Sequence, residues 1–376
     1  MRLIFVNIFV LFSVLSFAQE KLFIDLKPFA GRVAPHRIGM ESLAKGHSLG
    51  FELNFFRQNF SENIFTKKYN FPKTGIGLSF QSLGNPEDLG NVYAAYLLTE
   101  YDINKIFGIK VYSGLAFLTK KYDKIENSQN IAIGTNLNYY FNLGICFKQH
   151  IGNDIIALAP GLIHFSNGSI RMPNLGLNQV YLSLSYQFNV AERNKIKKVY
   201  LPENVSKSEF WVMATAINSD EYTIRPESRG GGFLCSTVAI GYNYAYSFTG
   251  KFGCSVDAFY NSNFQYYWDT NWDVLTLFYP DFKDVVRYGM SFGHQFVYSR
   301  FEMLTYAGFY LYNNRIKSNE FAYTRVGVRY YLTDFLFLNL TLKAFGFKAE
   351  YIESGIGFSY RKKQKENSRD YSLNSL

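Results

Sequence analysis

Polar and hydrophobic residues alternate in short segments along most of this 376-residue chain. Because side chains of an extended strand point alternately to its two faces, such a pattern predicts a strand with one apolar face and one mainly polar face. In Val180–Phe188 every second residue is apolar or aromatic, and the residues between are Tyr181, Ser183, Ser185 and Gln187. About sixteen such strands are predicted, about eight on each side of a break near residues 190–207. Other clear examples are Ile76–Gln81, Tyr323–Tyr331, Leu336–Lys343 and Ile352–Tyr360.

The connections between the predicted strands alternate in length. If the first strand rises from the periplasm, the short turns fall at the periplasmic end: Asp102–Lys105, Gly152–Asn153, Ser247–Lys251, Tyr298–Arg300 and Thr333–Asp334. The longer segments fall at the opposite end: Gly31–Gly46, Lys120–Asn127, Asn167–Leu177, Ser219–Gly232 and Asn263–Lys283. Short periplasmic turns and long outer loops are typical of outer-membrane β-barrels. One segment, Arg57–Phe71, breaks the pattern because it is long on the periplasmic side.

Composition supports a membrane barrel. Aromatic residues make up 19% of the chain, with 30 Tyr and 37 Phe, and the mean hydropathy is near zero, at −0.10. Beyond the N-terminus no apolar run reaches the roughly 20 residues that a membrane helix needs. The pattern therefore favours an all-β fold, a transmembrane antiparallel β-barrel, over the secreted β-sandwich that shares its period. Arg325, Arg329 and Glu353 are expected inside the barrel, because a charge on the lipid face at mid-membrane costs about 2–4 kcal/mol.

Residues 1–18 predict export. An apolar run, Leu3–Phe17, follows Arg2 and ends in Ser16-Phe17-Ala18, which has the small residues of a signal-peptide cleavage site. Combined with the barrel pattern, this predicts the bacterial outer membrane as the location. The cysteines, Cys146, Cys235 and Cys254, form no CxxC motif or His/Cys cluster, so neither a disulfide scaffold nor a metal site is predicted.

The segment Ala191–Ser208 is basic and polar, contains Pro, and is too long for a routine periplasmic turn. We therefore predict two eight-stranded barrels, in residues 19–190 and 208–361, joined by a basic linker at 191–207 and followed by a disordered tail at 362–376. One sixteen-stranded barrel would use the same strands and is the alternative. The net charge of +9 favours anionic lipid surfaces, whereas nothing predicts a nucleic acid or an obligate protein partner.

Candidate chemistry lies in the segment His164–Gln179, HFSNGSIRMPNLGLNQ, which places His164 and Ser166 two residues apart at the end of a strand. That strand begins at Asp154, and its odd-numbered row contains the small residues that a narrow lumen requires, Ala157, Ala159 and Gly161. The even-numbered row is therefore predicted to face lipid: Ile156, Leu158, Pro160, Leu162, His164 and Ser166. Asn178 continues the lipid-facing row of the next strand. Three polar residues are thus expected together on the outer wall, level with the outer leaflet, where unused polar groups are costly.

These residues resemble the outer-membrane lipid A 3-O-deacylases of the PagL type, an acyloxyacyl hydrolase family. The family motif is His-x-Ser-Asn, a spacer, Pro-Asn, Gly, and an acidic residue that opens the last strand of an eight-stranded barrel. The matching residues are His164, Ser166, Asn167, Pro173, Asn174 and Gly176, and the resemblance covers about residues 20–190. It implies hydrolysis of an acyl ester of lipid A, within lipopolysaccharide, with Ser166 as nucleophile, His164 as base, and neither cofactor nor metal. The family's acidic residue falls on Asn178, and for the second half of the chain no resemblance is found.

Asn178 leaves two interpretations open. An amide can hold the histidine ring but cannot stabilise an imidazolium by charge, and in a serine protease the Asp→Asn change costs about 10⁴ in kcat. The leading hypothesis is an outer-membrane esterase, with Asn167, Gly168 and Asn174 positioning the substrate or stabilising the oxyanion. The alternative is a non-catalytic barrel, a channel or a structural protein with a degenerate site. The other histidines are expected to be loop or barrel-lining residues: His36, His47, His150 and His294.

Overall fold

The computed structural model describes residues 20–60, 64–192, 207–220, 232–269, 274–277, 281–313, 320–346 and 348–361. The predicted signal peptide, most of the predicted linker and the predicted C-terminal tail lie outside these residues. Most of the described chain is β-strand, as the alternating pattern predicts. None of the helices within the described ranges is long and apolar enough to cross a membrane.

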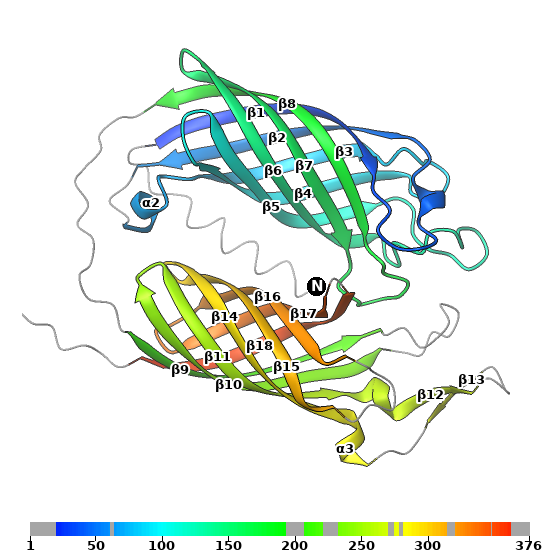
Figure 1. Ribbon diagram of the computed structural model, residues 1–376. Coiled ribbons are helices and arrows are strands. Elements are labelled where there is room, and N and C mark those ends of the chain that lie inside the picture. The colour runs from blue at the N-terminus through cyan, green and yellow to red at the C-terminus, as the bar shows by residue number, and fades with distance from the viewer. Residues whose placement is uncertain are drawn as a thin grey trace, which may run out of the picture. The chain divides into compact units, whose positions relative to one another are not determined.

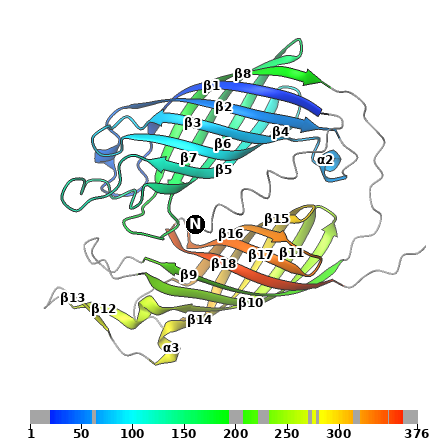
Figure 2. The same cartoon turned by 180° about the vertical axis from the view of Figure 1, so that it is seen from behind.

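The first half of the chain forms a closed antiparallel barrel, in which each strand pairs with the next and the last pairs with the first. At the closing seam Ile24 lies opposite Phe188, as expected if this half closes alone. Figures 1 and 2 show its wall from opposite sides. Its strands are β1 (Glu20–Val33), β2 (His47–Asn59), β3 (Lys73–Ser82), β4 (Asn91–Asp102), β5 (Phe107–Leu118), β6 (Leu137–Ile151), β7 (Asp154–Ser166) and β8 (Leu177–Glu192).

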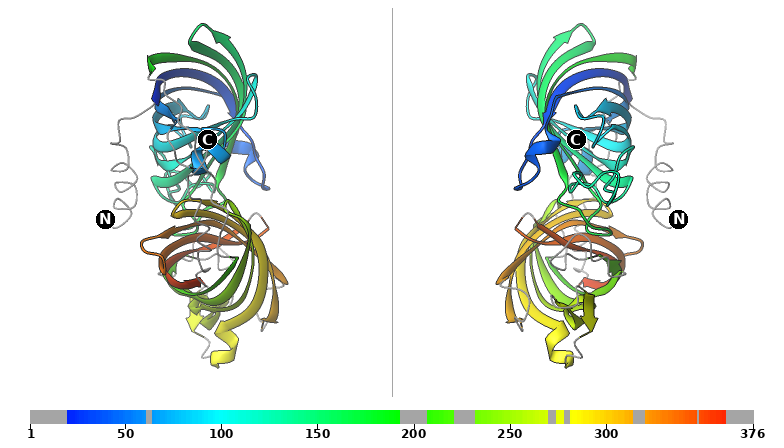
Figure 3. Two further views of the ribbon diagram at one scale, coloured as in Figure 1. Left: turned by 90° about the vertical axis from the view of Figure 1, so that its left-hand side faces the viewer. Right: turned by 90° about the vertical axis from the view of Figure 1, so that its right-hand side faces the viewer.

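The second half forms another closed barrel, whose last strand pairs with its first, with Phe358 opposite Val212. The prediction of two eight-stranded barrels is therefore confirmed, and the alternative of one sixteen-stranded barrel is wrong. The turned views in Figure 3 show the curvature of each wall. The strands are β9 (Ser208–Ser219), β10 (Phe233–Ser247), β11 (Gly250–Asn261), β14 (Val286–Tyr298), β15 (Phe301–Asn313), β16 (Ala322–Tyr331), β17 (Leu336–Phe345) and β18 (Lys348–Arg361).

Two of the predicted connections contain secondary structure that the pattern did not predict. In Arg57–Phe71, strand β2 continues to Asn59 and the helix α2 spans Ile64–Lys68. In Asn263–Lys283, the small sheet of β12 (Tyr266–Asp269) and β13 (Val274–Leu277) lies between two helices, η2 (Ser262–Gln265) and α3 (Phe282–Val285). One further 3-10 turn, η1 (Glu41–Leu43), lies in the connection after β1.

Each wall has an apolar outer face and a mixed lumen face. On β8, Val180, Leu182 and Leu184 are about half exposed, whereas Ser183 and Ser185 between them are buried. Such rows follow from the two-residue period of a strand, because the outer face meets lipid and the inner face meets the other strands' side chains. The outward row was therefore predicted correctly for β8.

The lumen of the first barrel is filled by a lysine–carboxylate network. Glu100 accepts from Lys73 at 2.7 Å and Lys148 at 2.8 Å, and Lys110 lies 3.4 Å away. All four side chains are almost fully buried, so each charge depends on its partners for the stabilisation that water would otherwise provide. The lumen also holds three stacked tyrosine rings, those of Tyr96, Tyr112 and Tyr140.

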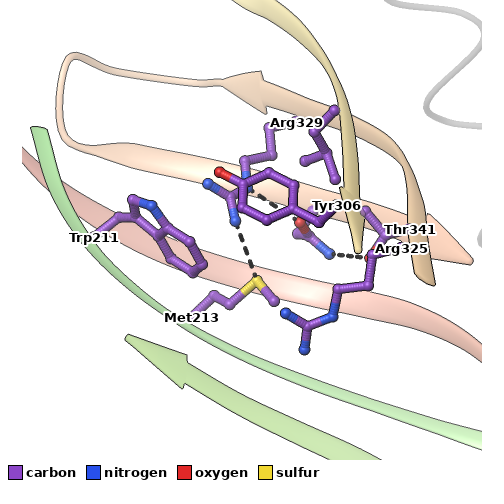
Figure 4. Close-up of a pocket in the computed structure, with 8 residues that line it drawn as sticks. Trp211, Met213, Tyr306, Arg325, Arg329 and Thr341 are labelled. Atoms are coloured by element: carbon purple, nitrogen blue, oxygen red, sulfur yellow. Dashed lines mark hydrogen bonds between the residues drawn. The ribbon is translucent and has the colours of Figure 1, made fainter. Parts of the chain in front are cut away.

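The lumen of the second barrel contains arginines as well as lysines. Arg325 donates to Asp257 at 2.9 Å and to Glu353 at 3.0 Å, and Arg329 stacks over the Trp211 ring at 3.9 Å. Arg325, Arg329 and Glu353 are all buried in the lumen, so that prediction is confirmed. Figure 4 shows Arg325 and Arg329 together with Trp211, Met213, Tyr306 and Thr341.

The space that these arginines leave is a cavity of about 10 Å³, which is comparable to the smallest cavities that hold one water. Its lining comes from four strands, β9, β15, β16 and β17, and includes Tyr306 of β15 and Asn339 of β17. Small barrels are generally filled in this way. A continuous aqueous channel is therefore not supported at this level of the second barrel.

Candidate active site

The position of the candidate site depends on which alternate residues of β7 face outward. His164 and Ser166 are partly exposed on the outer face, whereas Ile163 and Phe165 beside them are fully buried in the lumen. In the middle of β7 the odd row consists of small residues, because the lumen is narrow there. At Gly161, a Cβ would lie 2.4 Å from the Tyr181 hydroxyl that crosses the lumen. The predicted orientation of the β7 rows is confirmed.

Strand register brings Asn178 beside His164. In the β7–β8 ladder the two residues are direct partners, and His164 Nδ1 lies 2.6 Å from Asn178 Oδ1. An amide oxygen only accepts hydrogen bonds, so the proton of a neutral His164 ring is assigned to Nδ1. Nε2 then carries the lone pair. This is the tautomer that a general base requires.

Ser166 contacts Asn174 across the loop that joins β7 to β8. The Asn167 backbone N–H donates to Asn174 Oδ1 at 3.1 Å, which assigns the other end of the carboxamide as Nδ2. Asn174 Nδ2 then donates to Ser166 Oγ at 3.1 Å. The Asn167 side chain points elsewhere, with its Nδ2 donating to Thr135 Oγ1 at 3.3 Å. Ser166 is therefore held by an amide donor.

Two glycines of the loop have positive φ angles. Gly176 has φ +76°, and a Cβ there would lie 2.8 Å from His164 Cε1, so only glycine allows the chain to pass this close to the ring. Gly168 has φ +64°, as expected of a turn. However, Gly168–Met172 belongs to the second of the two compact units of the chain, whereas the other predicted site residues belong to the first. The structure therefore pairs His164 with Asn178 and Ser166 with Asn174, and it does not place Gly168 in the same unit as these residues.

Sequence reasoning missed one neighbour of the site, His36. The connection after β1 begins at Ala34, whose N–H donates to the carbonyl of Asn178 at 2.8 Å. Two residues further on, His36 Nε2 lies 3.1 Å from the carbonyl oxygen of Leu175, next to Gly176. The signal that could have found it is barrel closure, because closure places the end of β1 beside the start of β8.

The fold and the lipid-facing polar group define the class of this protein as a bacterial outer-membrane β-barrel, with a candidate hydrolytic site on its outer wall. Two family models match, lipid A 3-O-deacylase (PagL) over residues 50–187 and the acyloxyacyl hydrolase C-terminal domain over residues 208–363. The chain belongs to this family of lipid A deacylases, whose members are ester hydrolases. The second half therefore has a counterpart in the family, which the residues alone did not reveal.

Solved structures and curated proteins add little to this. The outer-membrane enzyme PagL is 18% identical and covers 44% of this chain and 99% of its own, with a TM-score of 0.32. Mutants of a Rhodopseudomonas blastica porin are 10% identical and cover 91% of this chain and all of their own, with a TM-score of 0.18. No curated protein matches the chain. TM-scores this low support no conclusion about function.

Proposed function

We propose that this protein is an outer-membrane esterase that removes an acyl chain from lipid A, with Ser166 as nucleophile and His164 as base. The observation that carries the proposal is the 2.6 Å contact between His164 Nδ1 and Asn178 Oδ1. It fixes the ring tautomer on the outer face of β7, where Ser166 lies one step along the same row. The proposal requires Ser166 Oγ to come within hydrogen-bond reach of His164 Nε2, because a serine hydroxyl is activated by an adjacent base.

In the proposed reaction, Ser166 Oγ attacks the ester carbonyl carbon while its proton passes to His164 Nε2. The tetrahedral intermediate collapses, the C–O bond to the sugar hydroxyl breaks, and His164 returns the proton to that oxygen. Water, deprotonated by the same nitrogen, then attacks the acyl-serine. The bond from the acyl carbon to Ser166 Oγ breaks, His164 returns the proton to that oxygen, and a free fatty acid leaves. Protons and electron pairs balance without a cofactor.

The oxyanion of the intermediate needs nearby hydrogen-bond donors. Asn174 Nδ2 is the best placed side-chain donor, because it already lies 3.1 Å from the atom that attacks. The Asn167 N–H is engaged by Asn174 Oδ1, so Asn167 supports the donor rather than contacting the oxyanion.

Asn178 orients the base without charge. An amide acceptor at 2.6 Å holds the ring as well as a carboxylate would, but it does not stabilise the imidazolium that forms when Ser166 is deprotonated. We therefore propose a slower enzyme than one with an acidic residue at this position. The exposed row Leu158, Leu162 and Leu182 beside the site offers acyl chains of the leaflet an apolar wall, so the substrate needs no enclosed pocket.

The same amide is what favours the second candidate function, a non-catalytic barrel with a degenerate site. Mass spectrometry of lipid A from cells expressing the wild-type chain or Ser166→Ala separates the two. We expect the wild-type chain alone to produce a species lighter by one acyl chain. If both proteins produced it, the chemistry would lie at another residue, and if neither did, the degenerate site would be the correct interpretation.

A further inference from the structure

The connection that follows β1 is anchored beside the proposed catalytic residues. Its first residue, Ala34, donates its N–H to the Asn178 carbonyl at 2.8 Å, and Met40 and Leu43 further along are fully buried. Between these anchors His36 is exposed, yet its Nε2 lies 3.1 Å from the carbonyl oxygen of Leu175. A carbonyl oxygen only accepts, so His36 Nε2 is the donor in this hydrogen bond.

Leu175 and Gly176 are held from their other side as well. Their N–H groups donate to carbonyl oxygens of the β5–β6 connection, Leu175 to Ile131 at 3.4 Å and Gly176 to Ala132 at 3.1 Å. The N–H groups of Leu175 and Gly176 thus hold the segment to the β5–β6 connection, and the carbonyl of Leu175 holds it to His36. Gly176 is thereby held at one position with respect to the ring edge of His164.

The edge of the His164 ring that contains Cε1 and Nε2 is the one that takes part in the proposed reaction. A Cβ at Gly176 would lie 2.8 Å from His164 Cε1 and 3.5 Å from His164 Nε2, the nitrogen that takes the serine proton. A shift of Leu175–Gly176 toward the ring would push His164 out of line, and a shift away would leave the ring free to rotate. Misplacement of a catalytic group by about 1 Å can lower a rate about 100-fold.

We propose that His36 is a positioning residue of the hydrolytic site, which acts through the Leu175 carbonyl and Gly176 to hold His164 in register with Ser166. The proposal rests on the proposed function, and it assigns His36 a role in the reactivity of the serine. It assigns His36 no contact with the substrate.

The test compares three variants of the full-length protein in detergent micelles. His36→Ala removes the donor. His36→Gln keeps an N–H at about the reach of imidazole Nε2 and removes the ring. Arg37→Ala, at the exposed neighbouring position, is the matched control. Two rates are measured, namely lipid A deacylation and covalent labelling of Ser166 by an alkyl fluorophosphonate, which needs an activated serine but no lipid A headgroup.

We expect His36→Ala to slow both rates about 10- to 100-fold through kcat, with KM unchanged, and His36→Gln to recover most of the loss. Arg37→Ala should match the wild-type protein. The proposal is overturned if His36→Ala matches the wild-type protein, if it slows deacylation through KM while labelling stays fast, or if Gln is as slow as Ala. Heat-modifiable electrophoretic migration confirms that each barrel is folded.

Failure of the proposed function gives a different result. If the wild-type protein neither labels nor deacylates, or if Ser166→Ala labels as fast as the wild-type protein, the assignment of the nucleophile is wrong and the role of His36 is overturned with it.

Discussion

The seventh strands of the two barrels, β7 and β17, show what distinguishes a site from a wall. Both carry an apolar outward row, and on β17 that row is Leu336, Leu338, Leu340 and Leu342. On β7 the row begins in the same way but ends in His164 and Ser166, next to the connection that joins β7 to β8. The fold is the same in both barrels. The proposed chemistry therefore depends on two positions at one strand end and on the loop that follows them.

His164 of the first barrel and His294 of the second, which both face outward, give a second comparison. His164 contacts an amide oxygen on the neighbouring strand, whereas His294 Nε2 lies 2.8 Å from the Tyr246 hydroxyl and its ring packs against Phe252 and Phe296. His294 is near the short-turn end of β14, where aromatic rings form the girdle typical of membrane barrels. We therefore assign His294 to the membrane interface and His164 to chemistry.

The largest expected effect separates these two histidines. His164→Ala should lower the rate of lipid A deacylation on the order of 10³-fold or more, because nucleophile and base act as one unit. His294→Ala should leave the rate unchanged. The measurement is deacylation of purified lipid A in micelles, and equal losses in both variants would show that the comparison of the barrels is mistaken.

Asn178 should have an intermediate effect. Asn178→Ala removes the acceptor that fixes the tautomer and should lower kcat roughly 10- to 100-fold, less than a triad carboxylate would because no charge is lost. Asn178→Glu should keep or raise activity if the acceptor geometry is retained. A kcat for Asn178→Ala equal to that of the wild-type protein would remove Asn178 from the mechanism.

A third prediction compares the lumens. Glu100→Gln leaves Lys73, Lys110 and Lys148 around a neutral group, and should lower the free energy of unfolding by about 3–5 kcal/mol. Arg329 forms no ion pair with any carboxylate among the residues that the structure describes, so Arg329→Met should change that free energy by about 1 kcal/mol or less. Urea unfolding in micelles measures both, and an equal loss in the two variants would contradict this account of the lumens.

The smallest effect is expected in the outer loops. A hydrogen bond from Lys45 lowers the pKa of Asp88 below its usual value, so its contribution to stability is present above about pH 4 and is lost as the pH falls through the lowered pKa. Asp88→Asn should therefore lower the melting temperature slightly at pH 7 and not at pH 2. The more exposed pair Lys283–Asp281 of the second barrel is the control, and Asp281→Asn should have less effect at either pH.

The rows of β7 and β8 could be predicted from the sequence because a strand's faces follow from a period of two and from local residue size. The choice of two barrels over one could be predicted only from the length and composition of the segment between the two halves, since both folds use the same strands and differ in whether β8 pairs with β1 or with β9. That pairing depends on contacts between residues far apart in the chain. For the same reason the position of His36 near His164 could not be predicted, because it depends on closure of the barrel and no local motif indicates it.

The bond between Ala34 and Asn178 crosses the seam where the first barrel closes, and this has a consequence for biogenesis. The β7–β8 hairpin carries His164, Ser166 and Asn178 by itself, whereas the segment with His36 joins it only when the first-made strand meets the eighth. If the proposed function holds, a chain in transit across the periplasm carries Ser166 and His164 without the support of His36. The proposed hydrolytic activity would then be acquired when the first barrel closes in the membrane.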